Sequence, residues 1–391
     1  MSTLDNKVSL EPNRVPLGRR ISEILAEKGG AFSIRAFADR IGMNRETLRI
    51  MVNGARRIAP SDLEIIAEGL GLSVERIKQT DTVRKEHQLH ALLQGKTQTK
   101  MMLIQASEIA DELLHLSIGA TERGFGLNNV GRVQYLQQKY EEAHQTWLHA
   151  HELAKNIYEQ YSDSHLLHLV TANLMLTYII RKDFSNIEGM LEVADSVFAE
   201  QPRAIGLVHY TRMKMFEARG NLELAKKHAY LSLEHYQLAF DQEQTGIALV
   251  NCAHFEYVLK RYQEAAKLLP QAIGLLQHYK YYRIFAVNEY AKTLIKLRAH
   301  ETANKMVEEH LESSKEYPDL YGKLLIAYSF SKDDPKYAHS VTNNTTFSLE
   351  VRFLACKYLM RYYSSIDDAD SLMKYYKMGR MFSEIDSDFF D

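Results

Sequence analysis

An alanine recurs in one frame along most of the chain, and this repeat constrains the fold more than any other feature. Each copy is a short segment ending in alanine, such as K-Y-E-E-A at Lys139 and R-Y-Q-E-A at Arg261. The positions are Ala143, Ile187 in an equivalent segment, Ala225, Ala265, Ala303 and Ala369, and they lie 44, 38, 40, 38 and 66 residues apart. The last gap leaves room for a degenerate unit around Tyr337. Such a period predicts stacked helix pairs, in which a small residue lets the second helix pack closely on the first.

The spacing of apolar residues predicts helices throughout this region. From Met101 to the C-terminus, apolar residues recur at intervals of three and four, whereas strands would show alternation. Residues 80–100 are polar but contain spaced leucines, which indicates a linker helix. We therefore expect an all-α chain with a linker helix over 80–100 and a repeat domain over 101–391.

The composition, 46% hydrophobic and 25% charged, is typical of a globular protein. No stretch approaches the roughly 18 apolar residues of a membrane span, and the N-terminus lacks the pattern of a secretion signal, so a cytoplasmic protein is expected. Cys252 and Cys356 are the only cysteines, too few for a disulfide framework or a thiolate metal site. We expect both to be buried and reduced.

The N-terminal segment is basic, although the whole chain carries a net charge of −2. Residues 14–57 contain ten basic side chains against four acidic ones, an excess of six. The basic residues are Arg14, Arg19, Arg20, Lys28, Arg35, Arg40, Arg45, Arg49, Arg56 and Arg57, and the acidic residues are Glu23, Glu27, Asp39 and Glu46. A local excess of this kind is expected of a nucleic-acid-binding module. The alternative is a solvated basic surface without a ligand.

Helix start and stop signals follow one another closely in this segment. We expect five helices: one over Leu17–Ala26, one capped by Ser33, one over Arg45–Val52 capped by Asn44, one from Pro60 to Leu70 and one from Ser73 to Gln79. Between the second and third helices, Gly42 suits a turn that requires positive φ. The segment therefore predicts a compact helical domain over residues 14–79.

The segment S-I-R-A-F-A-D-R-I-G-M-N-R-E-T-L-R-I-M-V-N-G, residues 33–54, resembles the helix-turn-helix of the Cro and phage-repressor family over all 22 positions. The resemblance implies that Arg45, Glu46, Arg49 and Ile50 face the bases of the major groove. Arginine suits guanine, glutamate suits cytosine and isoleucine suits the thymine methyl group. Arg35, Arg56 and Arg57 are expected to hold phosphates. Ile34 and Val52 stand where that family often has Gln and Glu, so those two contacts are not carried over.

The segment V-G-R-V-Q-Y-L-Q-Q-K-Y-E-E-A-H-Q-T-W-L-H-A, which begins at Val130, resembles the tetratricopeptide repeat. Its signature positions hold Gly131, Tyr140, Ala143, Trp147 and Ala150. The resemblance covers roughly residues 120–380. It implies a right-handed α-solenoid whose concave face is lined mainly by the first helix of each pair. The expected fold is thus a five-helix Cro/repressor-like domain followed by this solenoid.

Asparagine recurs at one phase of the repeats. Asn129, Asn173 and Asn251 each lie 14 residues before the alanine position of their unit, and Asn288 lies 15 before. Asparagine is a poor residue for a helix interior. A carboxamide both donates and accepts hydrogen bonds, so it can bind a peptide backbone. We interpret the four as candidate peptide contacts; the alternative is that they are exposed or satisfied structural residues.

The sequence lacks signs of an enzyme or a cofactor. It contains no G-x-S-x-G, H-E-x-x-H, Walker-type or dinucleotide glycine motif. His144, His149 and His151 lie on one predicted helix, but only the first and third share a face, so they are interpreted as surface histidines rather than metal ligands. We expect no catalytic residue, no metal and no cofactor.

A Cro-like domain joined to tetratricopeptide-like repeats resembles the RRNPP family of peptide-responsive quorum-sensing regulators. The resemblance implies a homodimer that binds a palindromic operator in double-stranded DNA and a short signalling peptide in the repeat groove, with 101–391 serving peptide binding and dimerisation. Two other functions stay open. One is a constitutive adaptor that the N-terminal domain tethers to DNA, and the other is a modulator of a response-regulator partner.

Overall fold

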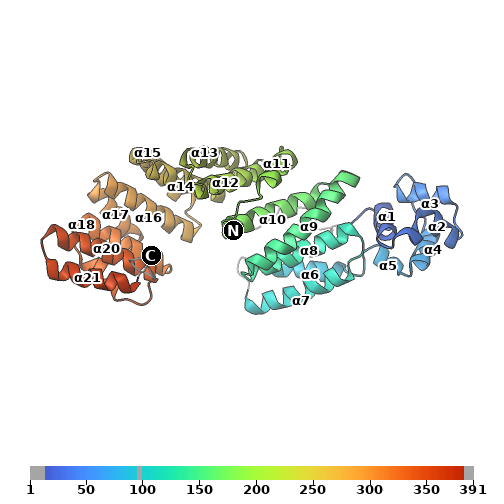
Figure 1. Ribbon diagram of the computed structural model, residues 1–391, viewed down its shortest axis with the longest axis horizontal. Helices are drawn as coiled ribbons and strands as arrows, with labels where there is room; N and C mark the ends of the chain where they lie inside the picture. The colour runs from blue at the N-terminus through green and yellow to red at the C-terminus, as the bar shows by residue number, and fades with distance from the viewer. Residues whose placement is uncertain (1–13, 95–98, 383–391) are drawn as a thin grey trace, which may run out of the picture. The chain divides into compact units, whose positions relative to one another are not determined.

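The computed structural model describes residues 14–94 and 99–382, and within them the chain forms helices and connecting segments without a β-strand. The predicted all-α fold is therefore confirmed over the described residues (Figure 1). They divide into two compact units, one ending at Ala199 and the other beginning at Glu200. None of the described helices has both the length and the apolar character that crossing a membrane requires.

The first unit begins with five short helices close to the expected bounds. They are α1 (Leu17–Glu27), α2 (Ile34–Arg40), α3 (Arg45–Val52), α4 (Pro60–Leu70) and α5 (Val74–Ile77), with a 3-10 turn at Gly30–Phe32. Asn44 caps α3 by accepting hydrogen bonds from the N–H groups of Glu46 and Thr47 at 2.9 and 3.2 Å. Gly42 has a φ of 66°, as the turn between α2 and α3 requires. Every one of the five helices contributes a fully buried side chain to one core: Ile21, Phe37, Leu48, Ile66 and Ile77.

Helix α6 (Val83–Gln94) occupies the segment expected to hold a linker helix, and it packs on α7 (Lys100–Leu116) through Leu89 and Leu93. Residues 95–98 of the predicted linker lie outside the described residues. The two compact units separate at Ala199, and this boundary does not test the predicted domain boundaries at residues 79 and 100. Those boundaries stay predictions.

The rest of the described chain consists of successive helix pairs. The first unit contains α8 (Ala120–Leu136) with α9 (Tyr140–Tyr161) and α10 (His165–Arg181) with α11 (Glu188–Val197). The second unit contains α12 (Pro202–Ala218) with α13 (Leu222–Leu238), α14 (Gln242–Val258) with α15 (Tyr262–Leu275), α16 (Lys280–Lys296) with α17 (His300–Ser314), α18 (Pro318–Lys332) with α19 (Lys336–Thr342), and α20 (Leu349–Ser365) with α21 (Ala369–Phe382). Helix α19 fills the place of the degenerate unit expected around Tyr337.

The predicted small-residue positions lie at helix contacts in all units but the last. All five are fully buried: Ala143, Ala225, Ala265 and Ala303 lie in the first turn of the second helix of their pair, and Ile187 directly precedes α11. The expectation is wrong for Ala369, which is exposed at the first residue of α21. In the α18–α19 pair, which the alanine frame skips, Ala338 is fully buried.

Two predicted signature residues make one close contact between α8 and α9. A Cβ atom at Gly131 would lie 2.4 Å from Nε1 of Trp147, so no larger residue fits there without rearrangement. Trp147 is buried, and its Nε1 donates a hydrogen bond to the carbonyl oxygen of Asn128 at 3.2 Å. The glycine therefore leaves room for the indole.

The interpretation of three surface histidines is wrong for two of them. His144 and His151 of α9 are only 3% and 5% exposed, whereas His149 is exposed. Helix α10 covers His144, whose Nδ1 lies 2.9 Å from the hydroxyl of Thr177. Burial lowers the pKa of His151 to about 4, so this side chain is neutral at pH 7. Within the described residues, no group of three or more potential ligands is arranged to hold a metal ion. Cys252 and Cys356 are buried and free, as expected.

Candidate nucleic-acid interface and ligand pocket

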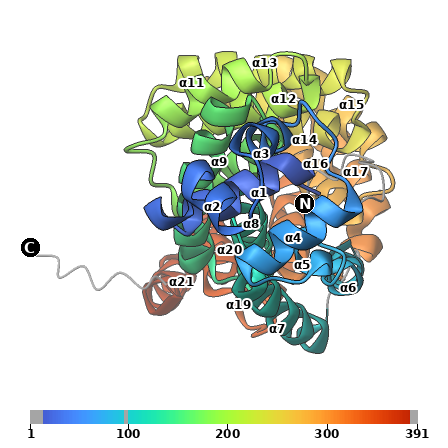
Figure 2. The same cartoon turned by 90° about the vertical axis from the view of Figure 1, so that its right-hand side faces the viewer.

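Helix α3 presents a polar face to solvent and an apolar face to the core. Arg45, Glu46 and Arg49 are exposed and Ile50 is half-buried, whereas Leu48 on the opposite face is fully buried. The five predicted helices therefore place these four side chains on one accessible surface. In Figure 1, α3 lies on the side of α1 that faces away from α8 and α9, and Figure 2, which is viewed from that side, shows α1 to α5 at the front.

Two of the four predicted base-reading residues bind each other. The guanidinium of Arg49 donates to both carboxylate oxygens of Glu46, at 2.9 and 2.5 Å. This hydrogen bonding lowers the pKa of Glu46, so the carboxylate is ionised at neutral pH. Arg45, by contrast, forms no hydrogen bond or ion pair with any residue that the structure describes. Arg45 is therefore the side chain that is immediately available to an acceptor.

The three predicted phosphate-binding arginines are also available. Arg35, Arg56 and Arg57 are exposed, and no carboxylate of the described residues lies within ion-pair distance of them. Arg35 belongs to α2, and the other two follow α3. Exposed cations around a candidate recognition helix are the arrangement that favours contact with a phosphate backbone.

Arg19 and Arg20, which the charge count included in the basic surface, face the repeats instead. Arg20 is 1% exposed, and its guanidinium donates to the carbonyl oxygens of Ile77, Ile118 and Arg76 at 2.9, 3.0 and 3.2 Å. It also forms an ion pair with Glu122 of α8 at 2.8 Å. Glu23 and Glu27 turn toward α8 as well. Two arginines and two glutamates therefore do not contribute to the exposed surface, and their charges cancel. The excess of six positive charges over residues 14–57 therefore stays on the remaining side chains.

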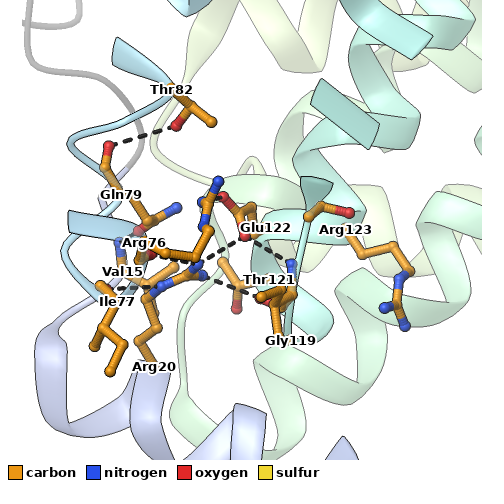
Figure 3. Close-up of polar contacts among 12 residues, drawn as sticks. Val15, Arg20, Arg76, Ile77, Gln79, Thr82, Gly119, Thr121, Glu122 and Arg123 are labelled. Carbon is orange, nitrogen blue, oxygen red and sulfur yellow. Dashed lines mark hydrogen bonds and ion pairs between the residues drawn. The ribbon is translucent and has the colours of Figure 1, made fainter. Parts of the chain in front are cut away.

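Glu122 connects the N-terminal helices to the repeats. One carboxylate oxygen binds Arg20, and the other forms an ion pair with Arg76, which belongs to α5 (Figure 3). The oxygen facing Arg20 also accepts the N–H of Ile118 at 2.7 Å. The Glu122 side chain is only 10% exposed, and the Arg20 and Arg76 side chains are 1% and 9% exposed. The bridge is therefore largely shielded from water. Removing one partner of a buried ion pair is destabilising, because it leaves a charge without compensation.

Two carboxylates of α1 cap the N-terminus of α8. Glu23 accepts the N–H and the hydroxyl of Thr121 at 2.9 and 2.6 Å, and Glu27 accepts the N–H of Gly119 at 2.6 Å. Burial alone would raise the pKa of Glu27, but hydrogen bonds from Arg123 and from the Gly119 N–H lower it below its ordinary value. Acidic groups at a helix N-terminus satisfy its free N–H groups and complement its dipole. We call these contacts, together with the Arg20–Glu122–Arg76 bridge, the α1–α8 junction.

Arg19 extends the α1–α8 junction to the far end of α9. Its guanidinium forms ion pairs with Glu23 at 2.9 Å and with Asp163 at 2.7 Å, and it lies 4.4 Å from the ring centroid of Tyr161. The sequence interpretation missed this role, because Arg19, Glu23 and Glu27 resemble an ordinary solvated stripe. Their spacing of four residues, which places them on one face of α1, is the available signal.

The four predicted peptide-binding asparagines all lie on the first helix of a pair. Asn129 and Asn173 belong to α8 and α10 in the first unit, and Asn251 and Asn288 belong to α14 and α16 in the second. The structure adds a fifth asparagine: Nδ2 of Asn173 donates to Oδ1 of Asn128 at 2.9 Å. Asn288 lines a pocket of about 790 Å³ in the second unit.

No protein-family model and no curated protein matches the chain. Solved structures share its fold. The chain matches the apo form of RapI with a TM-score of 0.58 at 12% identity, over 93% of this chain and 97% of RapI. It matches the apo form of the quorum sensor NprR from B. thuringiensis with a TM-score of 0.57 at 14% identity, over 94% of this chain and 99% of NprR.

A third solved structure comes from a different kind of protein. It is the Pyrococcus horikoshii STAND protein PH0952, which has a tetratricopeptide repeat sensor; the TM-score is 0.54 at 14% identity, and the match covers 94% of this chain and 63% of PH0952. Identities this low establish the fold alone. RapI and NprR are RRNPP proteins, so the expected tetratricopeptide-like architecture and the resemblance to that family are confirmed at the level of the fold.

Proposed function

We propose that the chain is a DNA-binding transcriptional regulator of the RRNPP type, controlled by a short signalling peptide that binds along the first helices of its repeats. One observation carries the proposal. The exposed face of α3 belongs to a group of helices that is joined by buried ion pairs to repeats, and these repeats have the fold of a quorum sensor. The candidate DNA-binding surface and the sensor-like repeats therefore belong to the same chain.

The DNA contacts follow from the accessible side chains. Arg45 meets a base edge, Ile50 packs beside it, and Arg35, Arg56 and Arg57 hold phosphates. Glu46 and Arg49 form one unit, since reading a base with either side chain requires opening their ion pair. Helix-turn-helix proteins commonly bind as dimers to two half-sites, so we propose a homodimer on a palindromic operator.

The α1–α8 junction supplies a physical path from ligand to DNA. Helix α8 is both the first helix of a repeat and the docking partner of α1. A peptide that favours another position of α8 therefore also changes the position of α1 and the domain behind it. Such a ligand acts only through its different affinities for the two arrangements.

Two alternatives keep the same fold but differ in the role of the repeats. In a constitutive adaptor, the repeats hold a protein partner and no peptide changes DNA binding. In a response-regulator modulator, the α3 surface has no DNA target. Arg45 is exposed and has no partner among the described residues, which favours the regulator over the second alternative, because a modulator needs no cation on that face.

The proposal is tested by selecting bound sequences from random double-stranded DNA with the full-length protein. We expect one palindromic sequence to be enriched, and we expect Arg45→Ala to weaken binding to it by roughly 1–3 kcal/mol, as loss of a bidentate base contact does. Lys305→Ala, an exposed cation on α17, is the control and should bind like the wild type. Enrichment of no sequence would contradict the proposal, as would equal binding by Arg45→Ala.

A further inference from the structure

The pocket of about 790 Å³ in the second unit extends across four helix pairs. Its lining comes chiefly from α14, α16, α18 and α20, which are the first helices of successive pairs. Side chains from Tyr257 on α14 to Arg361 on α20 reach it. A site assembled from four consecutive pairs suits an extended molecule better than a compact one.

Basic side chains dominate this pocket, although the chain as a whole is slightly acidic. Five cations contribute to the lining against one carboxylate, that of Glu289. The cations are Lys292, Lys296, Arg298, Lys323 and Arg361. Like charges gathered along apolar walls create a positive potential that favours an anionic ligand.

Three of the five cations lack a carboxylate partner among the described residues. Lys292 pairs with Glu289, and Lys323 lies 3.2 Å from a carboxylate oxygen of Glu350. Within residues 14–94 and 99–382, no carboxylate is within ion-pair distance of Lys296, Arg298 or Arg361. The pocket therefore holds three cations whose charge no described carboxylate neutralises.

Apolar and amide groups accompany these charges. Ile295, Ile326 and Leu354 line the same pocket, as does the carboxamide of Asn288. Nδ1 of His300, also in the lining, is buried without a hydrogen-bond partner in the described structure. The site thus offers apolar contacts and polar atoms beside its cations, which is the mixture expected of a small-ligand pocket.

The aromatic rings of the pocket already have cations over them. Lys292 lies 4.5 Å from the ring centroid of Tyr257, and Arg361 lies 5.1 Å from that of Phe330. A nucleotide base needs an open ring face on which to stack. These contacts therefore favour a peptide over a nucleotide as the anion.

We propose that this pocket binds a short peptide carrying a carboxylate next to an apolar side chain, and that Lys296 and Arg361 select for the carboxylate. The inference rests on the proposed peptide-regulated function and specifies the chemistry of the peptide. The carboxylate belongs either to an acidic side chain or to the peptide C-terminus. The apolar neighbour packs against Ile326 and Leu354.

The test uses full-length protein and four mixtures of heptapeptides whose randomised positions exclude Asp and Glu. The mixtures carry Asp or Asn at the central position and a free or amidated C-terminus, and retained peptides are quantified by mass spectrometry. We expect wild-type protein to retain at least one carboxylate-bearing mixture about tenfold better than the Asn-containing amidated mixture, as loss of a charge-assisted hydrogen bond predicts. Preference for Asp identifies a side-chain carboxylate, and preference for the free terminus identifies the C-terminal one.

Two double variants locate the selectivity. Lys296→Gln with Arg361→Gln should abolish the preference, whereas Lys305→Gln with Lys357→Gln, an equal charge change at exposed positions outside the pocket, should keep it. Equal retention of all four mixtures by the wild type would overturn the pocket assignment and leave peptide binding standing. Retention of none would overturn the proposed function together with it. An equal loss of preference in both double variants would also overturn the pocket assignment.

Discussion

The close packing of α8 on α9 depends on Gly131, which has no side chain. Gly131 lies against the indole of Trp147, and a methyl group at Gly131 would overlap three of its atoms at 2.4 to 2.8 Å. Because Trp147 is buried and hydrogen-bonded to the backbone of Asn128, it cannot move aside freely. The signature residues of this repeat therefore specify one helix contact at atomic scale.

Gly131→Ala is expected to lower the free energy of unfolding of the first unit by roughly 1–3 kcal/mol, because it overpacks a filled interior. Urea unfolding followed by the fluorescence of Trp147, the only tryptophan, measures the change. Gly189→Ala is the matched control: a Cβ on this residue of α11 meets nothing within 4 Å. It should stabilise by up to about 1 kcal/mol, since alanine favours a helix more than glycine does. Similar effects of both variants would contradict the account of Gly131.

At the scale of elements, α1 has two distinct contact faces. Ile21, Ile24 and Leu25 belong to the core of the N-terminal helices, whereas the charged side chains starting at Arg19 belong to the α1–α8 junction. The junction relies on Glu122, which compensates two buried guanidinium groups at once. Helix α1 therefore connects the core of the N-terminal helices, to which α3 belongs, to the repeats.

Glu122→Gln should open the α1–α8 junction, because it leaves the buried Arg20 guanidinium without a carboxylate partner and Arg76 with Asp81 alone, which destabilises the junction by roughly 3–5 kcal/mol. Hydrogen exchange of the Gly119 and Thr121 amides reports this directly, since they bind Glu27 and Glu23 rather than Glu122. We expect both amides to exchange faster while the amides of α3 keep their protection.

Glu112→Gln is the control for the junction. Its ion pair with Lys85 is exposed, and exposed pairs contribute about 0–1 kcal/mol, so exchange at Gly119 and Thr121 should not change. Wild-type exchange rates in Glu122→Gln would show that the bridge does not hold the N-terminal helices in place.

Local signals predicted most of the elements. Asn44 and Gly42 act through neighbours within a few residues, so the bounds of α2 and α3 follow from sequence alone. Arg20 and Glu122, by contrast, are 102 residues apart and meet only after the helices pack. Nothing local distinguishes Arg20 from the exposed arginines, and His144 is buried only because α10 covers it.

One of the four asparagines predicted to bind a peptide lies in the pocket that we propose as the peptide site. Asn288 lies in the pocket of the second unit, and the four asparagines occur on first helices as the repeat frame implies. The pairing of Asn173 with Asn128 was missed. The repeat frame singles out Asn129, and it cannot distinguish which of two adjacent asparagines of α8 faces Asn173. The cations of the pocket come from several pairs and share no phase, so no repeat pattern brings Lys296 and Arg361 together.

At the scale of the whole molecule, each unit contributes one basic surface to a chain of net charge −2. The first unit exposes the arginines around α3, and the second contains the pocket with Lys296, Arg298 and Arg361. Two separate positive sites on a mildly acidic chain are consistent with two different anionic ligands, a nucleic acid and a carboxylate-bearing peptide. The proposed function requires that binding of one ligand changes the affinity for the other.

This coupling is measured by the dissociation constant of the selected duplex, with and without a saturating amount of a peptide retained by the protein. Allosteric coupling of roughly 1–3 kcal/mol predicts a change of about 5- to 150-fold at constant salt. By linkage, the duplex should change the affinity for the peptide by the same factor. An unchanged dissociation constant at saturating peptide would contradict the account and favour the constitutive adaptor.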